Sequence, residues 1–201
     1  MKLHLGNGTI YLDPKDGWVN IDIFGKLASE NPELVERNIT TIDKYYKYPW
    51  RTHTVIHVTD MIMDARDLSY FDDNSIEEIL SVNLIDHMKK NEFLKTLQEW
   101  RRVLKVGGKL IVDVDDRRKQ ANVLVEAKTQ EEMEWGLRLI YCDSKWEGRT
   151  HFWGYTPGYL KTILEDCGFK HEWTRNDYIV HDAPYIKNDN CPNFQICAIK
   201  K

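Results

Sequence analysis

Two glycines follow the first apolar run of the chain. Leu3-His4-Leu5 leads directly into Gly6-Asn7-Gly8, and Asp22 stands fourteen residues after Gly8, within the β-rich run 18–23. Because glycine has no Cβ, such a turn lets the backbone come close to a ligand. A carboxylate at the tip of the neighbouring strand can accept hydrogen bonds from both hydroxyls of a ribose. This spacing favours a nucleoside-binding site.

The glycine pattern argues against a dinucleotide ligand. A dinucleotide fingerprint needs a third glycine near position 11, where this chain has Tyr11, and its acidic residue usually lies farther along the chain. A nucleoside without a pyrophosphate therefore fits better. Gly6-Asn7-Gly8 alone could be an ordinary turn. The strand before it and Asp22 after it favour a turn that binds a ligand.

A second acidic turn follows a later strand-like run. Met63-Asp64-Ala65 ends the run, and Asp64 can accept a hydrogen bond from an adenine amino group while an adjacent backbone N–H meets the ring nitrogen. Asp72-Asp73-Asn74-Ser75, farther on, has the composition of a polar turn before a strand, and we interpret it mainly as such.

The order of strand-like and helix-like runs predicts the architecture that positions these residues. We expect strands at residues 3–5, 18–23, 55–58 or 61–63, 76–82 and 109–114. An apolar stripe predicts a helix over 91–104, ended by Gly107-Gly108, and Thr156-Pro157 begins a second helix that closes at Gly168. Alternating strands and helices favour a parallel sheet covered by helices, a doubly wound α/β fold.

Two further expectations concern the C-terminal strands and residues 24–54. Residues 170–174 and 193–198 read as strands of a C-terminal antiparallel hairpin. Residues 24–54 contain a polar helix-like stretch and the aromatic cluster Tyr45, Tyr46, Tyr48 and Trp50. We interpret 1–201 as a single domain in which 24–54 is an insertion or a lid.

Composition excludes several classes of protein. The net charge of −4 is spread over mixed signs without basic blocks, which argues against a nucleic-acid partner. The four cysteines lack CxxC spacing, so we expect reduced thiols and a cytoplasmic location. No apolar run is long enough to span a membrane, and the N-terminus lacks the pattern of a signal peptide. The oligomeric state stays open.

Several of these segments together resemble a known family. Leu5-Gly6-Asn7-Gly8, residues 18–23, Asp73-Asn74-Ser75, Asp86-His87 and above all the run 99–110 (EWRRVLKVGGKL) look like the class I S-adenosylmethionine-dependent methyltransferases, in particular small predicted members of the type 11-like group. The resemblance implies a Rossmann-like fold with a mostly parallel seven-stranded sheet. It also implies S-adenosylmethionine as the cofactor.

The resemblance implies which residues of this chain contact the cofactor. It implies that Gly6 and Gly8 approach the methionine part of the cofactor, that Asp22 holds the ribose and that Asp64 with Ala65 borders the adenine. Asn83 is expected just past the fourth strand. The complete set of expected cofactor-binding residues is Leu5, Gly6, Asn7, Gly8, Asp22, Ile23, Asp64, Ala65 and Asn83. Asn7 departs from the pattern, since the family usually has cysteine there.

Catalytic candidates must lie at the carboxyl ends of the strands, where open α/β sheets bind ligands. These are Asp86, His87, Asp115, Asp116, His151 and Tyr155. We expect His87 and Asp115 to act in catalysis. For His87 the reason is that an unperturbed histidine titrates near neutrality and can serve an oxygen nucleophile. The alternative for His87 is support of the cofactor loop. Asp113, Asp115 and Asp116 could hold magnesium, but no further acid is placed beside them, so no metal is expected.

The expected function is methylation of an oxygen or nitrogen on a small molecule or a glycan. A DNA amino-methyltransferase would carry an Asn/Asp-Pro-Pro-aromatic turn after the fourth strand, where this chain has Asn83-Leu84-Ile85-Asp86. A protein that keeps the fold and the cofactor pocket but has lost catalysis is the alternative from another class, because one fold hosts many functions.

Overall fold

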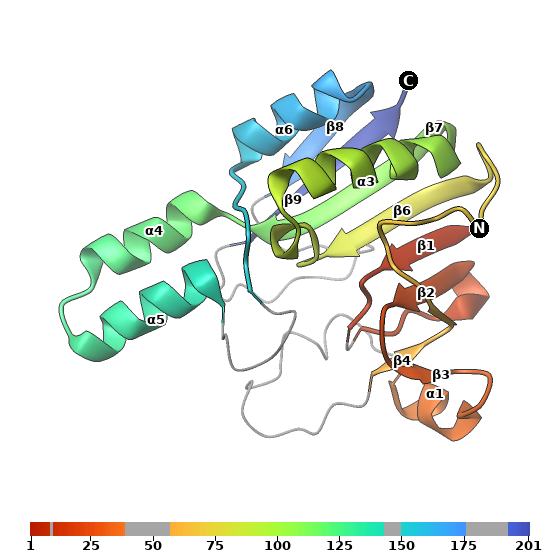
Figure 1. Ribbon diagram of the computed structural model, residues 1–201, viewed down its shortest axis with the longest axis horizontal. Helices are drawn as coiled ribbons and strands as arrows, with labels where there is room; N and C mark the ends of the chain where they lie inside the picture. Colours follow the sequence, from red (N-terminus) through yellow and green to blue (C-terminus); the bar gives the residue numbers. More distant parts are fainter. Residues whose placement is uncertain (9, 39–56, 143–149, 176–192) are drawn as a thin grey trace.

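A seven-stranded sheet forms the centre of the molecule (Figure 1). The computed structural model describes residues 1–8, 10–38, 57–142, 150–175 and 193–201. The sheet has the strand order β5-β2-β1-β6-β7-β9-β8. Its strands are β1 (Lys2–Leu5), β2 (Trp18–Asp22), β5 (Met61–Ile62), β6 (Ile76–Val82), β7 (Leu104–Asp115), β8 (Phe169–Arg175) and β9 (Asn193–Lys200).

Strand directions confirm the expected fold class. The pairs β5–β2, β2–β1, β1–β6 and β6–β7 are parallel, whereas β7–β9 and β9–β8 are antiparallel. The antiparallel pair at the C-terminus is the expected hairpin, and β9 enters the sheet between β7 and β8. Because β1, β2 and β6 are parallel neighbours, their carboxyl ends meet at one edge of the sheet, where ligands bind in open α/β folds.

Helices α3 (Lys90–Val103) and α6 (Pro157–Asp166) pack on the same face of the sheet (Figure 1). The predicted apolar stripe of α3 is buried there, with Phe93, Leu97 and Trp100 fully shielded from solvent in the main core cluster. A smaller cluster contains Ile10 and Trp18 together with residues of β6. The 3-10 turns η1 (Pro14–Asp16) and η2 (Ile85–His87) follow β1 and β6 along the chain.

The position of Gly107-Gly108 corrects one expectation. α3 already ends at Val103, and the glycines lie inside β7, where the register between β6 and β7 shifts. Gly107 has φ +79°. The glycines therefore permit an irregular start of the strand, and they do not cap the helix.

Part of the predicted insertion is described. β3 (Lys26–Leu27) pairs in parallel with β4 (Val58–Thr59), and α1 (Pro32–Asn38) corresponds to the helix-like stretch of the sequence. Residues 39–54, which include the aromatic cluster, lie outside the described residues. The lid interpretation of 24–54 therefore stays a prediction.

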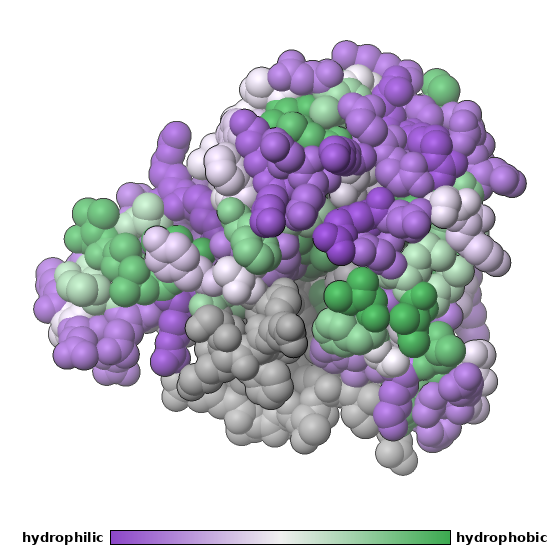
Figure 2. All heavy atoms as spheres, viewed as in Figure 1, coloured by the Kyte–Doolittle hydropathy of each residue, from purple (hydrophilic) through white to green (hydrophobic). Residues whose placement is uncertain are grey.

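A helical hairpin follows β7 and was not expected from the sequence. α4 (Arg117–Glu126) and α5 (Gln130–Tyr141) project from the body of the molecule (Figure 1). Asp116 caps α4, and Thr129 with Glu132 forms a capping box on α5. Figure 2 shows apolar side chains among the exposed atoms of this hairpin. None of the described helices has the length and apolar character needed to cross a membrane.

Candidate functional site

The glycine turn after β1 has the backbone conformation that the sequence predicts. Gly6 and Gly8 have φ +65° and +49°, in the left-handed region that favours glycine. A Cβ on Gly6 would lie 2.8 Å from Cδ1 of Leu84, whereas a Cβ on Gly8 would meet no atom within 4 Å. The turn therefore packs closely on one side and leaves open space on the other.

Asp22 closes this turn from the end of β2. Its Oδ2 accepts a hydrogen bond from the Gly8 amide at 2.8 Å, and its Oδ1 accepts one from the Ile23 amide at 2.7 Å. The residue is 8% exposed. Each carboxylate oxygen has a second lone pair, so both can still accept hydrogen bonds from a ligand hydroxyl.

Leu5 and Asn7 support the turn through buried side chains. Leu5 is fully buried in the main core. The Asn7 side-chain amide donates to the carbonyl oxygens of Val58 at 2.9 Å and of Ile10 at 3.3 Å, so its side chain ties the turn to β4. Asparagine thus performs a structural task at the position where the family usually has cysteine.

A cleft of about 440 Å³ opens at this edge of the sheet. Every residue of the expected cofactor set except Leu5 lines it. The walls also include His57, Arg66, Leu84, His87, Met88 and Phe152. Sequence reasoning did not assign His57, Arg66, Leu84 or Met88 to this site, because apolar and single basic residues carry no recognisable spacing.

The turn after β5 forms one wall of the cleft. Arg66 binds both carboxylate oxygens of Asp64, with Nε and Nη2 at 2.7 to 3.0 Å. These bonds lower the pKa of Asp64. The neighbouring Ala65 is buried, and its carbonyl oxygen accepts a hydrogen bond of 2.8 Å from Nε1 of Trp100. Helix α3 thereby fixes the wall that the sequence assigns to the adenine.

Asn83 lies just past β6, as expected, and has φ +46°. Its backbone amide donates to the Asp113 backbone carbonyl at 2.8 Å, and its side-chain Oδ1 accepts a hydrogen bond of 2.8 Å from the Asn193 side chain. The left-handed backbone turns the chain away from the sheet and into η2. This turn places Asp86 and His87 at the cleft edge.

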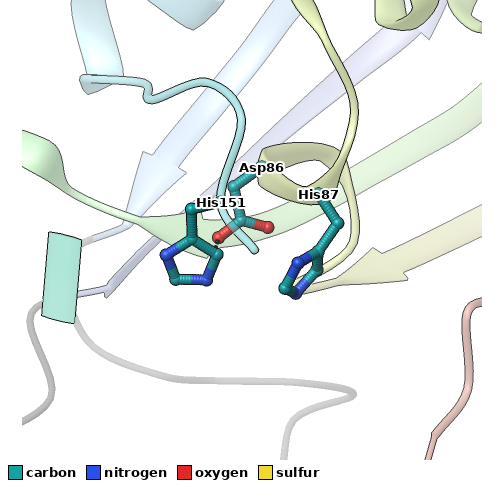
Figure 3. Close-up of side chains that lie close together, drawn as sticks. All are labelled: Asp86, His87 and His151. Atoms are coloured by element: carbon teal, nitrogen blue, oxygen red, sulfur yellow. Dashed lines mark ion pairs between the residues drawn. The ribbon is translucent and has the colours of Figure 1, made fainter. Parts of the chain in front are cut away.

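Three catalytic candidates meet beside the cleft (Figure 3). Asp86 and His87 come from η2, and His151 comes from the segment before α6. The carboxylate of Asp86 lies near both rings, and its Oδ2 is 3.1 Å from Nε2 of His151. The two imidazole centroids are 4.9 Å apart. Burial lowers the pKa of His151 despite the neighbouring Asp86 carboxylate.

Asp115 lies at the end of β7 and does not line the cleft. Its Oδ2 accepts a hydrogen bond from Gln120 at 2.5 Å and lies 3.6 Å from Nη1 of Arg117. Burial, followed by the charge of Asp86, raises the pKa of Asp115 to about 7. Arg117 also lies 3.4 Å from Oδ2 of Asp86, so it links the two carboxylates. Sequence reasoning missed Arg117, although it follows Asp115-Asp116 directly.

The remaining candidates have structural roles. The Asp116 carboxylate accepts a hydrogen bond from the Arg118 amide at the start of α4. Tyr155 is 1% exposed and packs edge to face against Phe93 in the core. Burial raises its pKa. Neither residue lines the cleft.

The residues present fit a nucleoside cofactor. Gly8 leaves open space beside the turn, and Asp22 retains acceptor capacity on both carboxylate oxygens. The exposed side chains of Ile23 and Phe24 continue the cleft wall after Asp22. Apolar faces suit a flat base, and a carboxylate suits a ribose.

A family model matches the chain from residue 25 onward, after the glycine turn and Asp22. A family model described as "Methyltransferase domain" matches residues 25–112. A search of curated proteins finds no match.

Solved structures share the fold at low sequence identity. A SAM-dependent methyltransferase from Methanosarcina mazei is 20% identical, with 99% of this chain and 91% of that chain covered and a TM-score of 0.54. A Listeria monocytogenes protein assigned as an S-adenosylmethionine-dependent methyltransferase is 16% identical, with 100% and 89% covered and a TM-score of 0.59. Magnesium protoporphyrin IX methyltransferase from Synechocystis, with bound SAH, is 14% identical, with 100% and 74% covered and a TM-score of 0.53.

These findings confirm the resemblance that the sequence indicates. The family match and the structural neighbours are consistent with the class I S-adenosylmethionine-dependent methyltransferases. The chain shares the fold of S-adenosylmethionine-dependent methyltransferases, and residues 25–112 match a methyltransferase-domain model; together these findings indicate S-adenosylmethionine as the cofactor.

Proposed function

We propose that the protein transfers the methyl group of S-adenosylmethionine to an oxygen or nitrogen of a small molecule or a glycan. The observation that carries this proposal is that one cleft contains the glycine turn, Asp22 and His87. A cofactor held by the first two groups lies in the same space as a side chain that can act on an acceptor.

Binding of the cofactor rests on the turn and on the two acidic positions. In this proposal Gly6 and Gly8 face its methionine part, and Asp22 accepts hydrogen bonds from its ribose hydroxyls. Asp64 and Ala65 border the adenine. When bound, S-adenosylmethionine supplies a methyl group on a sulfonium, which an aligned nucleophile displaces in line.

His87 is the group that we assign to the acceptor. Its Nδ1 lies 3.2 Å from the carbonyl oxygen of Thr150. A carbonyl only accepts hydrogen bonds, so Nδ1 carries the hydrogen in the neutral ring and Nε2 keeps a lone pair. That lone pair can accept a hydrogen bond or a proton from an acceptor hydroxyl or amine. Asp115 contributes indirectly in this proposal, by holding Arg117 against Asp86.

The walls around His87 help to exclude water. Leu84, Met88 and Phe152 line the cleft next to it, and Phe152 is 52% exposed. Its amide donates to the Asp86 carbonyl at 2.8 Å, which fixes the segment before α6 over η2. An exposed ring held in this way can pack on the flat face of a sugar or an aromatic acceptor.

Transfer of label from methyl-labelled S-adenosylmethionine to a panel of phenols, amines and glycans tests the proposal. We expect labelled product with at least one acceptor class, and a reduction of kcat in the range of ~10²–10⁴-fold in His87→Ala. His171→Ala on β8 is the matched control and keeps full activity. Cofactor binding without a labelled product from any acceptor would favour the inactive binding protein instead.

A further inference from the structure

Asp86, His87 and His151 form a cluster that the proposed methyl transfer does not fully use. Each residue offers one ligand atom, and these three atoms lie within 4.8 Å of one another. The side chains converge from two segments far apart in the sequence (Figure 3). Two imidazoles with one carboxylate are a common ligand set for divalent metals.

Both rings are oriented in the manner of metal ligands. Nδ1 of His87 lies 3.2 Å from the Thr150 carbonyl oxygen, and Nδ1 of His151 lies 3.2 Å from the Ile140 carbonyl oxygen. Each carbonyl fixes the hydrogen on Nδ1 and leaves the Nε2 lone pair for a cation. Metal-binding histidines usually donate their other ring N–H to such a backbone acceptor.

The carboxylate gives a second, independent observation. Asp86 is 1% exposed, and its Oδ1 is buried without a hydrogen-bond partner among the residues that the structure describes. Leaving a buried carboxylate oxygen unsatisfied is costly, and a bound cation removes that cost. The other carboxylate oxygen, Oδ2, lies 3.1 Å from Nε2 of His151, roughly the separation of two ligands at right angles, each about 2.1 Å from one ion. A carboxylate can bind one ion through both of its oxygens.

The charge around the cluster permits a cation. Besides His151, the basic side chain that pairs with Asp86 among the described residues is Arg117, at 3.4 Å, and Arg117 also lies 3.6 Å from Asp115. Two carboxylates therefore share one guanidinium, at distances longer than those of a strong charged hydrogen bond.

We propose that Asp86, His87 and His151 bind a divalent metal ion of the borderline class, such as Zn²⁺ or Co²⁺, at the edge of the cofactor cleft. Nitrogen ligands disfavour Mg²⁺ and Ca²⁺, which take oxygen. Three protein ligands leave coordination positions open to the cleft that His87 lines.

The role of the ion rests on the proposed function, whereas its binding does not. An acceptor hydroxyl bound at an open position would release its proton to solvent water more readily, as metal-bound water does. In that state Nε2 of His87 is committed to the ion. His87 then acts on the acceptor through the metal and no longer takes the proton itself.

Titration of the metal-free 201-residue protein with Co²⁺ tests the site directly. We expect visible d–d absorption that saturates at a single equivalent, and a rise in the melting temperature. In His87→Ala and His151→Ala the affinity for Co²⁺ should fall by on the order of 100-fold or more, while His171→Ala binds as the wild type does. His87→Ala is the safer variant, because His151 also pairs with the buried Asp86 carboxylate, at 3.1 Å. Circular dichroism confirms that each variant is folded.

Two results would overturn the proposal: no Co²⁺ binding by the folded wild type, or equal affinity in the wild type, His87→Ala and His151→Ala. A parallel titration with S-adenosylmethionine after chelation separates the two proposals. Cofactor binding without metal binding removes only the metal site. Metal binding without cofactor binding removes the proposed function and leaves the site.

Discussion

The amide of Gly8 donates a 2.8 Å hydrogen bond to Oδ2 of Asp22. This bond joins the turn after β1 to the end of β2, so the carboxylate is fixed before any ligand arrives. A fixed carboxylate pays less conformational entropy when it binds a ribose. The proposed cofactor site is therefore largely pre-formed by the backbone of the turn.

Alanine at the two glycines of this turn should have different consequences. Gly6→Ala combines φ +65° with a contact of 2.8 Å to Leu84, so we expect a loss of roughly 1–3 kcal/mol of stability. Gly8→Ala has the strain of φ +49° but no atom within 4 Å, so the variant should fold. Its methyl group would enter the open space, and we expect about tenfold weaker cofactor binding.

Urea denaturation and cofactor titration of both variants check this contrast. Gly158→Ala on α6 is the matched control, since its Cβ also meets no atom within 4 Å. Full cofactor affinity in Gly8→Ala would show that the ligand does not approach this turn.

Trp100→Phe should weaken the wall assigned to the adenine. The substitution removes the Nε1 hydrogen bond to the Ala65 carbonyl and leaves a buried acceptor unsatisfied, at a cost of ~1–3 kcal/mol. We expect a lower melting temperature and a several-fold loss of cofactor affinity. Trp135→Phe on α5, where the ring is half exposed, is the control and should change neither quantity. An unchanged melting temperature in Trp100→Phe would contradict the assigned role of this bond.

Stability should fall with rising pH because of Asp113. Burial, together with the charges of Asp115 and Asp86, raises the pKa of Asp113 well above its ordinary value. The folded protein then retains a proton that the unfolded chain releases above pH ~3.9. The contribution of Asp113 to folding free energy therefore becomes less favourable as pH rises from about 4 toward its folded pKa.

Asp113→Asn removes this titration. We expect the variant to be more stable than the wild type at pH 8, with the difference shrinking toward pH 4.5 in urea denaturation. Asp16→Asn, at an exposed position in η1, should show no such trend. A stability difference that is identical at both pH values would refute the assignment.

Local patterns were enough to predict the sheet, the two major helices and the glycine turn after β1. The stripe of Phe93, Leu97 and Trp100 is buried as its spacing indicates, and Gly8 meets Asp22 because parallel neighbouring strands end at one edge. These features depend on short separations along the chain or on the general rule for strand ends.

The hairpin α4–α5 and the Asp86 cluster depend on tertiary packing. The α4 helix has a weak apolar pattern. The Thr129 and Glu132 capping box, with the helical spacing of Met133, Leu137 and Ile140, could have indicated α5. His151 reaches Asp86 because the amide of Phe152 bonds to the Asp86 carbonyl, a contact that no local pattern encodes. The glycines at 107 and 108 resemble a helix stop, yet they accommodate the irregular start of β7.

Calorimetric titration of the 201-residue protein with S-adenosylmethionine and S-adenosylhomocysteine tests the central claim most directly. The account predicts micromolar binding of both by the wild type and by Asp16→Ala. It also predicts loss of binding in Asp22→Ala with the fold retained by circular dichroism. Absence of binding to the folded wild type, or unchanged binding in Asp22→Ala, would contradict it.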